Sequence, residues 1–345
     1  MSESALLRDI KGQPDSIQSV IDRQCGGEAF EAAEALRSAE DVIFTGMGSS
    51  LYACYAAAHL LIERGIRASV IDAAELLYYQ LGLCRPGCTV VLVSRSGETV
   101  EVLKLLSALG ATGARAVGVT SEPGSTLARE TKPSLVVGSH RDQLVAIQSY
   151  TGTVAALVIV ALTARGESLA SIREGASPLP EAMRQAISES ITRENPDTLL
   201  HTRAVYLLGR GPSLGSVREG ALLFNEASRA PSVAMTAAEF RHGPVEVIDR
   251  DFFAFVFSSQ AATAALDRQL ALDIQAGGGH VILSSDLARC EAVRPAYAPV
   301  LEIIPVQIAA WQLAERKGIA PGSFRFAPLV TSTEAGFQAP ARIDS

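Results

Sequence analysis

The stretch Gly46-Met-Gly-Ser-Ser-Leu51 returns as Gly209-Arg-Gly-Pro-Ser-Leu214, and each copy is followed at the same interval by a glutamate, Glu63 or Glu226. Both offsets are 163 residues (209 − 46 and 226 − 63). Each copy follows an apolar run and opens a helix-like segment. A repeat at about half the chain length indicates a duplicated domain, because solenoid repeats have periods of roughly 20 to 50 residues. We therefore predict two similar domains in this chain of 345 residues.

Apolar runs of strand length alternate with helix-like patterns in both halves. In the first half the runs are Val42–Thr45, Ala68–Ile71, Thr89–Val93, Ala116–Thr120 and Leu135–Val137. In the second half they are Val205–Leu208, Ser232–Met235, Phe252–Phe257, His280–Leu283 and Val300–Ile304. Strands that are apolar on both faces are typical of a parallel sheet covered by helices. We expect an α/β fold with two five-stranded parallel sheets flanked by helices, one sheet in each half.

The region between the halves differs in composition from both. Residues Ala164–Pro196 carry charges, Pro178 and Pro180, and an amphipathic stretch at Glu181–Thr192, which together indicate a helical connector. We assign an N-terminal helical segment to 1–29, the first domain to 30–165, the connector to 166–197, the second domain to 198–330 and a C-terminal tail to 331–345.

Composition excludes several classes of partner. The net charge of −7 argues against nucleic acid or a membrane surface, because both require a basic face. The longest apolar run, Thr151–Leu162, is shorter than the roughly 20 residues that cross a bilayer, and the start of the chain has no signal-peptide pattern. The five cysteines are odd in number, and only Cys84 and Cys88 lie close together. We expect a cytoplasmic protein with reduced, mostly buried thiols and no metal site.

The glycine-rich turns do not match the dinucleotide-binding fingerprint. That fingerprint requires a third glycine, where this chain has Leu51 and Leu214. Asp72, at the end of the second expected strand, is a candidate for the acidic residue that binds a ribose. The run Asp72-Ala-Ala-Glu75 is also a capping box for the next helix, and this alternative is favoured.

The segment Ser94-Arg-Ser-Gly-Glu-Thr99 follows the third expected strand and precedes the helix-like Val100–Leu109. Hydroxyls on a strand-to-helix turn can donate to phosphate oxygens, while the free N–H groups of the helix favour a negative charge. The alternative is that these residues only cap the helix, although a cap needs one hydroxyl and this turn offers three. Ser50 is expected at the same carboxyl edge of the sheet, where ligands of open α/β sheets bind. We therefore predict that the two turns share one phosphate.

These motifs resemble the sugar isomerase (SIS) domain, in the tandem arrangement of the isomerase half of glucosamine-6-phosphate synthase. The resemblance covers about residues 30–330 and is carried by four motifs: Gly46-Met-Gly-Ser-Ser50, Ser94–Thr99, Gly209-Arg-Gly211 and Glu239-Phe-Arg-His-Gly-Pro244. It implies that Ser50, Ser94, Ser96 and Thr99 hold the sugar phosphate. Gly48 and Ser49 are further candidate substrate-binding residues. Arg95 stands where the family has a glutamine, and it either strengthens phosphate binding or projects away.

The resemblance also implies two catalytic residues. The family's catalytic glutamate falls on Glu226, and its ring-opening histidine, donated by the partner subunit of a homodimer, falls on His242, 16 residues later (242 − 226). Proton transfer between C1 and C2 of an opened sugar requires a carboxylate base with a pKa raised toward neutrality, and ring opening requires a group such as imidazole. The alternative is that Glu226 is a solvated helix residue and His242 a buried hydrogen-bonding residue. Glu63 is interpreted as structural.

Several residues differ from those of the synthase, and these differences exclude parts of its reaction from the activity that we expect. Leu223 and Leu329 stand where the synthase has lysines, so a Schiff-base route is not expected, and Ala146 replaces a polar residue near the sugar. Residues Met1–Gln24 are too few for a glutaminase domain, so glutamine-driven amination is not expected of this chain alone.

Similar tandem proteins imply a cofactor-free amino-sugar phosphate deaminase or isomerase, or a deglycase. The alternatives are an aldose–ketose phosphate isomerase without nitrogen chemistry and a phosphosugar sensor without catalysis. A sensor would need a basic recognition helix, and the sequence shows none.

Overall fold

The first half folds around a parallel sheet. The structure is a computed structural model that describes residues 3–193, 195, 197–321, 323–326 and 330–334. The sheet has the strand order β2-β1-β3-β4-β5. Its strands are β1 (Asp41–Gly46), β2 (Arg67–Asp72), β3 (Cys88–Val93), β4 (Arg115–Thr120) and β5 (Ser134–Val136). All five strands predicted in this half are confirmed.

The second half repeats this arrangement with one strand fewer among the described residues. Its parallel sheet has the order β7-β6-β8-β9. The strands are β6 (Val205–Gly209), β7 (Ser232–Thr236), β8 (Phe253–Val256) and β9 (His280–Leu283). In both halves the strand that ends in a glycine turn, β1 or β6, is paired on both sides. The carboxyl ends of paired parallel strands meet at one edge, which brings the turns that follow them together.

The predicted strand Val300–Ile304 is wrong. These residues lie inside helix α15 (Ala298–Arg316), and every one of them is buried. An apolar run that is buried on all sides has neither the period of a half-exposed strand nor that of an amphipathic helix, so periodicity cannot distinguish the two. The length of the helix, 19 residues, is the feature that separates it from a strand.

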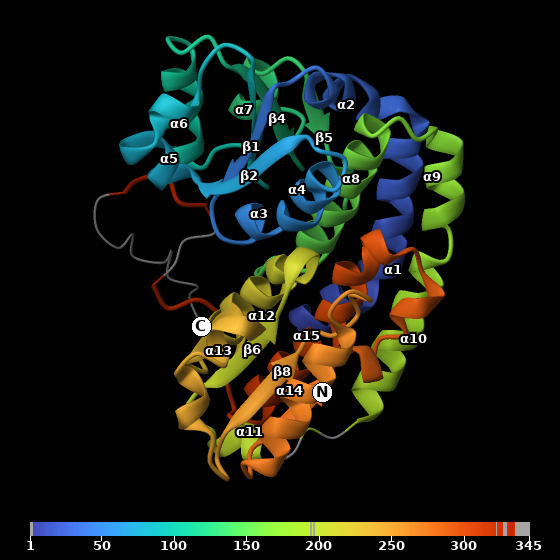
Figure 1. Ribbon diagram of the computed structural model, residues 1–345, viewed down its shortest axis with the longest axis vertical. Coiled ribbons are helices and arrows are strands. Elements are labelled where there is room, and N and C mark those ends of the chain that lie inside the picture. Colours follow the sequence, from blue (N-terminus) through green and yellow to red (C-terminus); the bar gives the residue numbers. More distant parts are fainter. Residues whose placement is uncertain (1–2, 194, 196, 322, 327–329, 335–345) are drawn as a thin grey trace.

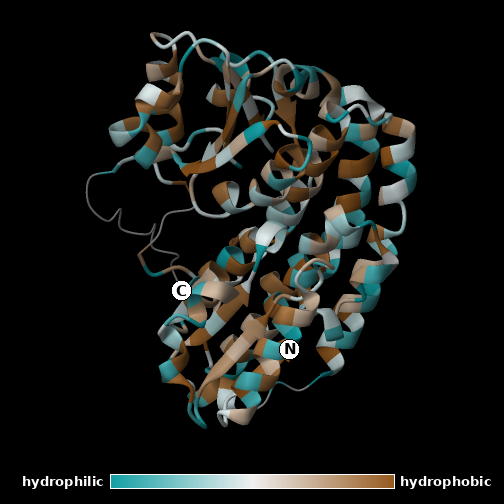
Figure 2. Cartoon of the chain, in the orientation of Figure 1, coloured by the Kyte–Doolittle hydropathy of each residue, from teal (hydrophilic) through white to brown (hydrophobic). Residues whose placement is uncertain are grey.

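Long helices join the two halves of the chain (Figure 1). Helix α1 (Ala5–Arg23) packs against α8 (Gln148–Ala164), α10 (Leu179–Thr192) and α15. Helix α8 is buried along its whole length, and one hydrophobic cluster runs from the strands of the first sheet to those of the second. Figure 2 shows hydrophobic residues gathered on the strands and on the inward faces of the helices. The two sheets are therefore joined through a shared core.

Shorter helices lie in each half of the chain and between the halves. In the first half they are α2 (Ala29–Arg37), α3 (Ser49–Tyr52), α4 (Tyr55–Ile62), α5 (Ala73–Tyr79), α6 (Val100–Leu109) and α7 (Thr126–Glu130). Helix α9 (Leu169–Ala176) and α10 lie between the halves, and α10 contains the amphipathic stretch Glu181–Thr192. In the second half they are α11 (Thr198–His201), α12 (Leu214–Ala227), α13 (Ala237–Phe240) and α14 (Ala264–Ala276).

Two smaller predictions also have outcomes. The carboxylate of Asp72 accepts hydrogen bonds from the N–H groups of Ala74 and Glu75, which confirms it as the cap of α5. The five cysteines form no disulfide, and all except Cys25 are buried. Among the helices of the described residues, none combines the length and hydrophobicity needed to cross a membrane.

Candidate functional site

The turn after β1 brings its backbone close to the neighbouring strand. A β-carbon at Gly46 would lie 2.6 Å from the carbonyl oxygen of Val93, so a larger residue would push the turn away from β3. Gly48 has a φ of 51°, in the left-handed region that favours glycine. Helix α3 begins directly afterwards, at Ser49. These two glycines place Ser49 and Ser50 at the carboxyl edge of the sheet, beside the end of β3.

The turn after β3 is ordered by hydrogen bonds of its own hydroxyls. Ser94 Oγ accepts a bond from the N–H of Gly97 (3.0 Å) and shares a bond with Thr99 Oγ1 (2.8 Å). Ser96 Oγ accepts from the N–H of Glu98 (3.2 Å). Thr99 is the N-cap residue of α6, yet its side chain makes no capping bond. Capping of α6 therefore does not explain the Thr99 hydroxyl, and the turn carries more hydroxyls than its helix uses.

Both turns face one pocket. Its volume is about 280 Å³, and it lies between the turns of the first half, the start of α8 and the end of α12. The predicted site residues that line it are Gly48, Ser49, Ser50, Arg95, Ser96, Thr99 and Glu226. Ser94 is buried behind the turn, where it supports Thr99. The structure therefore brings all the predicted substrate-binding residues together with one of the two predicted catalytic residues.

Glu226 is held in a partly buried position in the last turn of α12. Burial raises the pKa of its carboxyl to about 7, and the nearby charge of Arg95 opposes the shift. The negative end of the helix dipole also disfavours an ionised carboxyl at this position. Glu226 is therefore not the solvated helix residue of the alternative interpretation. A carboxyl with a pKa near 7 can both take up and release a proton at neutral pH.

Glu219 supports the site from outside the pocket lining, and the sequence reasoning missed it. It lies seven residues before Glu226 on the same face of α12 (226 − 219) and accepts a hydrogen bond from Ser49 Oγ (3.1 Å). Burial, with a contribution from Glu226, raises its pKa well above the ordinary value. Its second carboxyl oxygen, Oε2, is buried and has no hydrogen-bond partner among the described residues. The spacing of seven residues from Glu226 was the signal that could have identified it.

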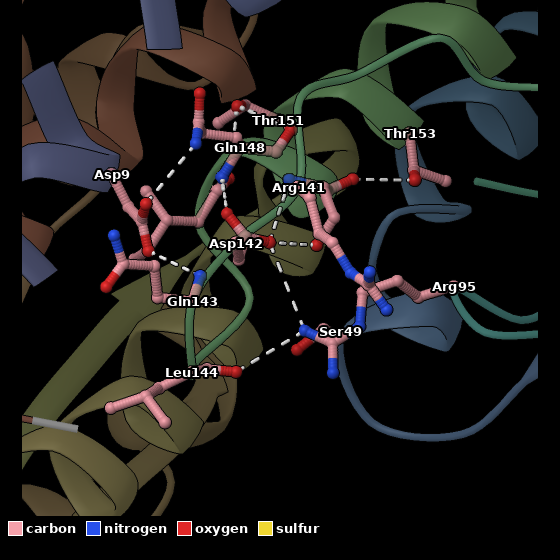
Figure 3. A network of polar contacts seen from close by, with 12 residues as sticks. Asp9, Ser49, Arg95, Arg141, Asp142, Gln143, Leu144, Gln148, Thr151 and Thr153 are labelled. Atoms are coloured by element: carbon pink, nitrogen blue, oxygen red, sulfur yellow. Dashed lines mark hydrogen bonds and ion pairs between the residues drawn. The ribbon is translucent and has the colours of Figure 1, made fainter. Parts of the chain in front are cut away.

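Arg95 contacts the loop that forms one wall of the pocket (Figure 3). Its Nη1 donates to the carbonyl oxygen of Leu144 (3.4 Å) and lies 4.0 Å from Asp142 Oδ2. The Asp142 side chain is fully buried and accepts bonds from the N–H of Gln148 (2.7 Å) and from the N–H (3.1 Å) and hydroxyl of Ser149. Asp142 thus caps α8 and holds the loop beside Arg95.

A second buried carboxylate holds the same loop from its other side. Asp9, on α1, accepts bonds from the N–H of Gln143 (2.9 Å) and from Gln148 Nε2 (3.4 Å). Burial raises the pKa of both Asp9 and Asp142. Figure 3 shows Asp142 between Arg95 and the backbone of the loop, with Asp9 on the side away from Arg95. The wall that carries Leu144, and with it the position of Arg95, therefore depends on two carboxylates outside the pocket.

His242 lies apart from Glu226 within the chain. It is exposed in the turn after α13, where its N–H donates to the carbonyl oxygen of Glu239 (2.9 Å), and it is not the buried residue of the alternative interpretation. It lines a separate hollow of about 530 Å³ with Arg218, Thr236 and Glu239, among others. A single chain therefore presents the two predicted catalytic side chains in two different hollows.

The remaining candidates have structural surroundings. Glu63 is exposed at the end of α4 and forms an ion pair with Arg165 (3.2 Å). Leu223 is buried in the core, and Ala146 lines the pocket. Leu329 lies outside the described residues. Within the described part of the chain, no group of three or more His, Cys, Asp or Glu side chains is arranged to hold a metal ion.

Relatives of known name match almost the whole chain. The chain is 27% identical over 333 residues to glutamine–fructose-6-phosphate aminotransferase [isomerizing] of Pyrobaculum aerophilum, covering 92% of this chain and 55% of the relative. The corresponding protein of Sulfurisphaera tokodaii is 28% identical over 327 residues, covering 92% and 54%. The chain thus spans about half the length of the curated relatives it matches.

Solved structures share the fold. Glucosamine-6-phosphate deaminase from Thermotoga maritima has a TM-score of 0.75 at 23% identity, covering 92% of this chain and 97% of the other. The C-terminal domain of glucosamine-fructose-6-phosphate aminotransferase from Francisella tularensis has a TM-score of 0.78 at 19% identity, with coverage of 92% and 97%. Tagatose-6-phosphate ketose/aldose isomerase from Escherichia coli has a TM-score of 0.75 at 19% identity, with coverage of 92% and 94%.

The SIS domain pattern matches this chain twice, over residues 35–170 and residues 198–305. The two matches together cover more than half of the chain and correspond to its two sheets. This chain therefore belongs to the SIS domain family and carries two copies of the domain in tandem.

Proposed function

We propose that this chain is a phosphosugar enzyme that releases ammonia or an amine from an amino-sugar phosphate. The observation that carries the proposal is Glu226, a carboxyl with a pKa of about 7 that shares a pocket with two hydroxyl-rich turns. The turns suit a phosphate group, and the carboxyl suits proton transfer at carbon. The names of the relatives agree with a sugar phosphate as substrate, since they include a deaminase and an isomerase of hexose phosphates.

The phosphate is proposed to bind at the turns of the first half. Ser50, Ser96 and Thr99 line the pocket, and Thr99 is at the N-terminus of the ten-residue helix α6, whose dipole favours an anion. Ser94 supports this arrangement by its bond to Thr99 Oγ1. A bond to a charged group contributes about 1.5 to 3 kcal/mol, so loss of one hydroxyl should weaken binding by roughly 10- to 100-fold.

Glu226 is proposed to move a proton between C1 and C2 of the open-chain sugar. With a hexosamine phosphate, the C2 proton moves to C1 while a proton passes from nitrogen to O1, which gives a C2 imine. Water hydrolyses this imine to a ketose phosphate and ammonia. With a ketosamine phosphate, the proton moves from C1 to C2 and the nitrogen proton passes to O2. Hydrolysis of the resulting C1 imine then releases an amine and an aldose phosphate.

His242 is proposed to open the sugar ring from a partner subunit. Within one chain it lines a different hollow from Glu226, so the proposed site needs a second copy of the chain to bring the two together. Mixing inactive Glu226→Gln and His242→Ala chains tests this arrangement. Random reassortment into homodimers should restore about one quarter of the wild-type activity, because half of the dimers are mixed and each has one intact site. Absence of any recovery after verified subunit exchange would exclude a shared site.

Amine release is the test of the proposed activity. Hexosamine 6-phosphates and ketosamine 6-phosphates are incubated with wild type, Glu226→Gln and the matched control Glu63→Gln, which changes the counterpart residue at an exposed position. We expect release by wild type and by Glu63→Gln, and a loss of about 10²- to 10⁴-fold in Glu226→Gln.

The same panel separates the alternatives. Exchange of a deuterium at C2 without amine release would indicate an aldose–ketose isomerase. Phosphosugar binding that survives Glu226→Gln, with no turnover in wild type, would indicate a sensor. The expected cytoplasmic location of the protein stays a prediction.

A further inference from the structure

The second half retains the two turns that form the candidate phosphate site of the first half. Ser213 corresponds to Ser50, because the repeat has an offset of 163 residues (213 − 50). The strand pairing shows that the turn after β8 corresponds to the turn after β3. Thr45 pairs with Leu92 of β3, and Leu208, the counterpart of Thr45 in the repeat, pairs with Val256 of β8. The turn that begins two residues after Leu92 is Ser94–Ser96, and the turn that begins two residues after Val256 is 258–260. The second half therefore has serines on both turns as well.

A carboxyl side chain of the same protein occupies the second pair of turns. The carboxylate of Glu302, on α15, accepts a bond from Ser213 Oγ at Oε2 (2.6 Å). Its Oε1 accepts from the N–H of Ser259 (3.0 Å) and from Ser284 Oγ (3.4 Å), which follows the next strand, β9. The three donors thus come from the turns after β6, β8 and β9. Glu302 itself is completely buried.

The charged side chain in the first of these turns, Arg210, also has its partner within the chain. Arg210, in the first of the two turns, donates through Nε to Asp267 Oδ1 (2.8 Å), and Thr263 Oγ1 donates to Asp267 Oδ2 (2.8 Å). The Asp267 side chain is buried and lies in the first turn of α14. The guanidinium of Arg210 is thereby directed to Asp267 rather than to a ligand between the turns.

We propose that the second half keeps the two-turn anion site of the first half and that the carboxylate of Glu302 is its permanent ligand. Groups that donate and do not accept favour the ionised form of a carboxyl, and the Ser259 N–H is such a group. Burial raises the pKa of Glu302, and the bonds from Ser213 and Ser259 oppose that shift. Each chain then has one two-turn site that is open to a phosphosugar, in the first half. In the second half, the two-turn site binds Glu302 and so joins α15 to the second sheet.

Deletion of the carboxylate tests the proposal. Glu302→Ala removes a fragment with the same heavy atoms as acetate, so free acetate can occupy the vacated position. The unfolding midpoint of the variant is measured in acetate and in chloride at equal pH and ionic strength, beside wild type. We expect a saturable rise of roughly 3 °C for the variant at ten times the dissociation constant, well above the response of wild type. Adding Ser213→Ala to this variant should abolish the rise.

Two outcomes would overturn the proposal. One is a folded Glu302→Ala protein that responds to acetate no more than wild type does. The other concerns folding: if the alanine variant does not accumulate in folded form, Glu302→Ser is refolded with and without acetate. Failure of both variants to fold in acetate would contradict a site that recovers when its anion is supplied. Because the comparison is made against wild type, the result does not depend on whether the two-turn site of the first half binds a phosphosugar.

Discussion

Replacing Glu226 with glutamine should stabilise the folded protein above neutral pH while it lowers the proposed amine-releasing activity. The folded protein holds this carboxyl at a pKa of about 7, against an ordinary value of 4.5. The difference is about 2.5 units (7 − 4.5), and each unit corresponds to about 1.4 kcal/mol. Ionised Glu226 therefore costs the folded state about 3 kcal/mol, and an uncharged glutamine of similar shape does not carry this cost.

The sign of the pH dependence follows from the direction of the shift. A carboxyl whose pKa is raised by folding binds its proton more tightly in the folded state than in the unfolded state. Its contribution to stability is fully present below pH 4.5 and is lost as the pH rises to about 7. Glu226→Gln should consequently stabilise the protein by about 3 kcal/mol near pH 8 and by about 1 kcal/mol or less near pH 5.

Urea unfolding at about pH 5 and pH 8 measures this difference. The matched control is Glu63→Gln, because Glu63 is exposed at the corresponding position of the first half. We expect the control to change the free energy of unfolding by about 1 kcal/mol or less, because it removes the ion pair between Glu63 and Arg165. If Glu226→Gln changes the stability equally at both pH values, the carboxyl does not have a raised pKa in the folded protein. The argument for Glu226 as a base at neutral pH would then fail.

Two further perturbations test the surroundings of the site. Arg95→Gln removes the charge that lowers the pKa of Glu226, so the acid limb of the pH–rate profile should move to higher pH. The control is Arg141→Gln, at a side chain that is 88% exposed, and it should leave the acid limb in place. Gly97→Ala should lower the free energy of unfolding, measured by urea titration, by about 2 kcal/mol or more, because Gly97 has a φ of 65° and a β-carbon there would overlap the hydroxyl of Ser125. The control is Gly26→Ala, because a β-carbon at Gly26 would meet no side chain or distant backbone atom within 4 Å.

Nine of the ten predicted strands are present because each is short, apolar and bounded by turn residues. The remaining segment, Val300–Ile304, is also short, but it continues as a mostly apolar, buried run to Leu313 inside α15. This run is broken by Glu302, by Gln307 and by the partly exposed Trp311 and Gln312. Its environment is set by packing between α10, α12 and α1, which lie far from it in the sequence. Local pattern could not supply that information.

The candidate site was predictable where a turn carries its own chemistry. Ser96 and Thr99 stand on one strand-to-helix turn, and the strand pairing then places Ser50 beside them. Asp142 and Glu219 were missed for a different reason. Asp142 caps α8 from six residues before Gln148, outside the usual capping spacing. Glu219 contacts Ser49 across 170 residues of sequence, and this contact exists only after α12 has packed against α3.

The pocket is built from unequal contributions of the two halves. The hydroxyl-rich turns belong to the first half, whereas Glu226 belongs to α12 of the second half, as does Glu219, which lies behind the pocket. The bond from Ser49 to Glu219 joins these contributions directly, across 170 residues of sequence. If a substrate is held by its phosphate at these turns, as proposed, the packing of α12 against the first half determines which of its carbons reaches Glu226. Changes at that contact, as well as changes within the pocket, should therefore alter which sugar phosphates react.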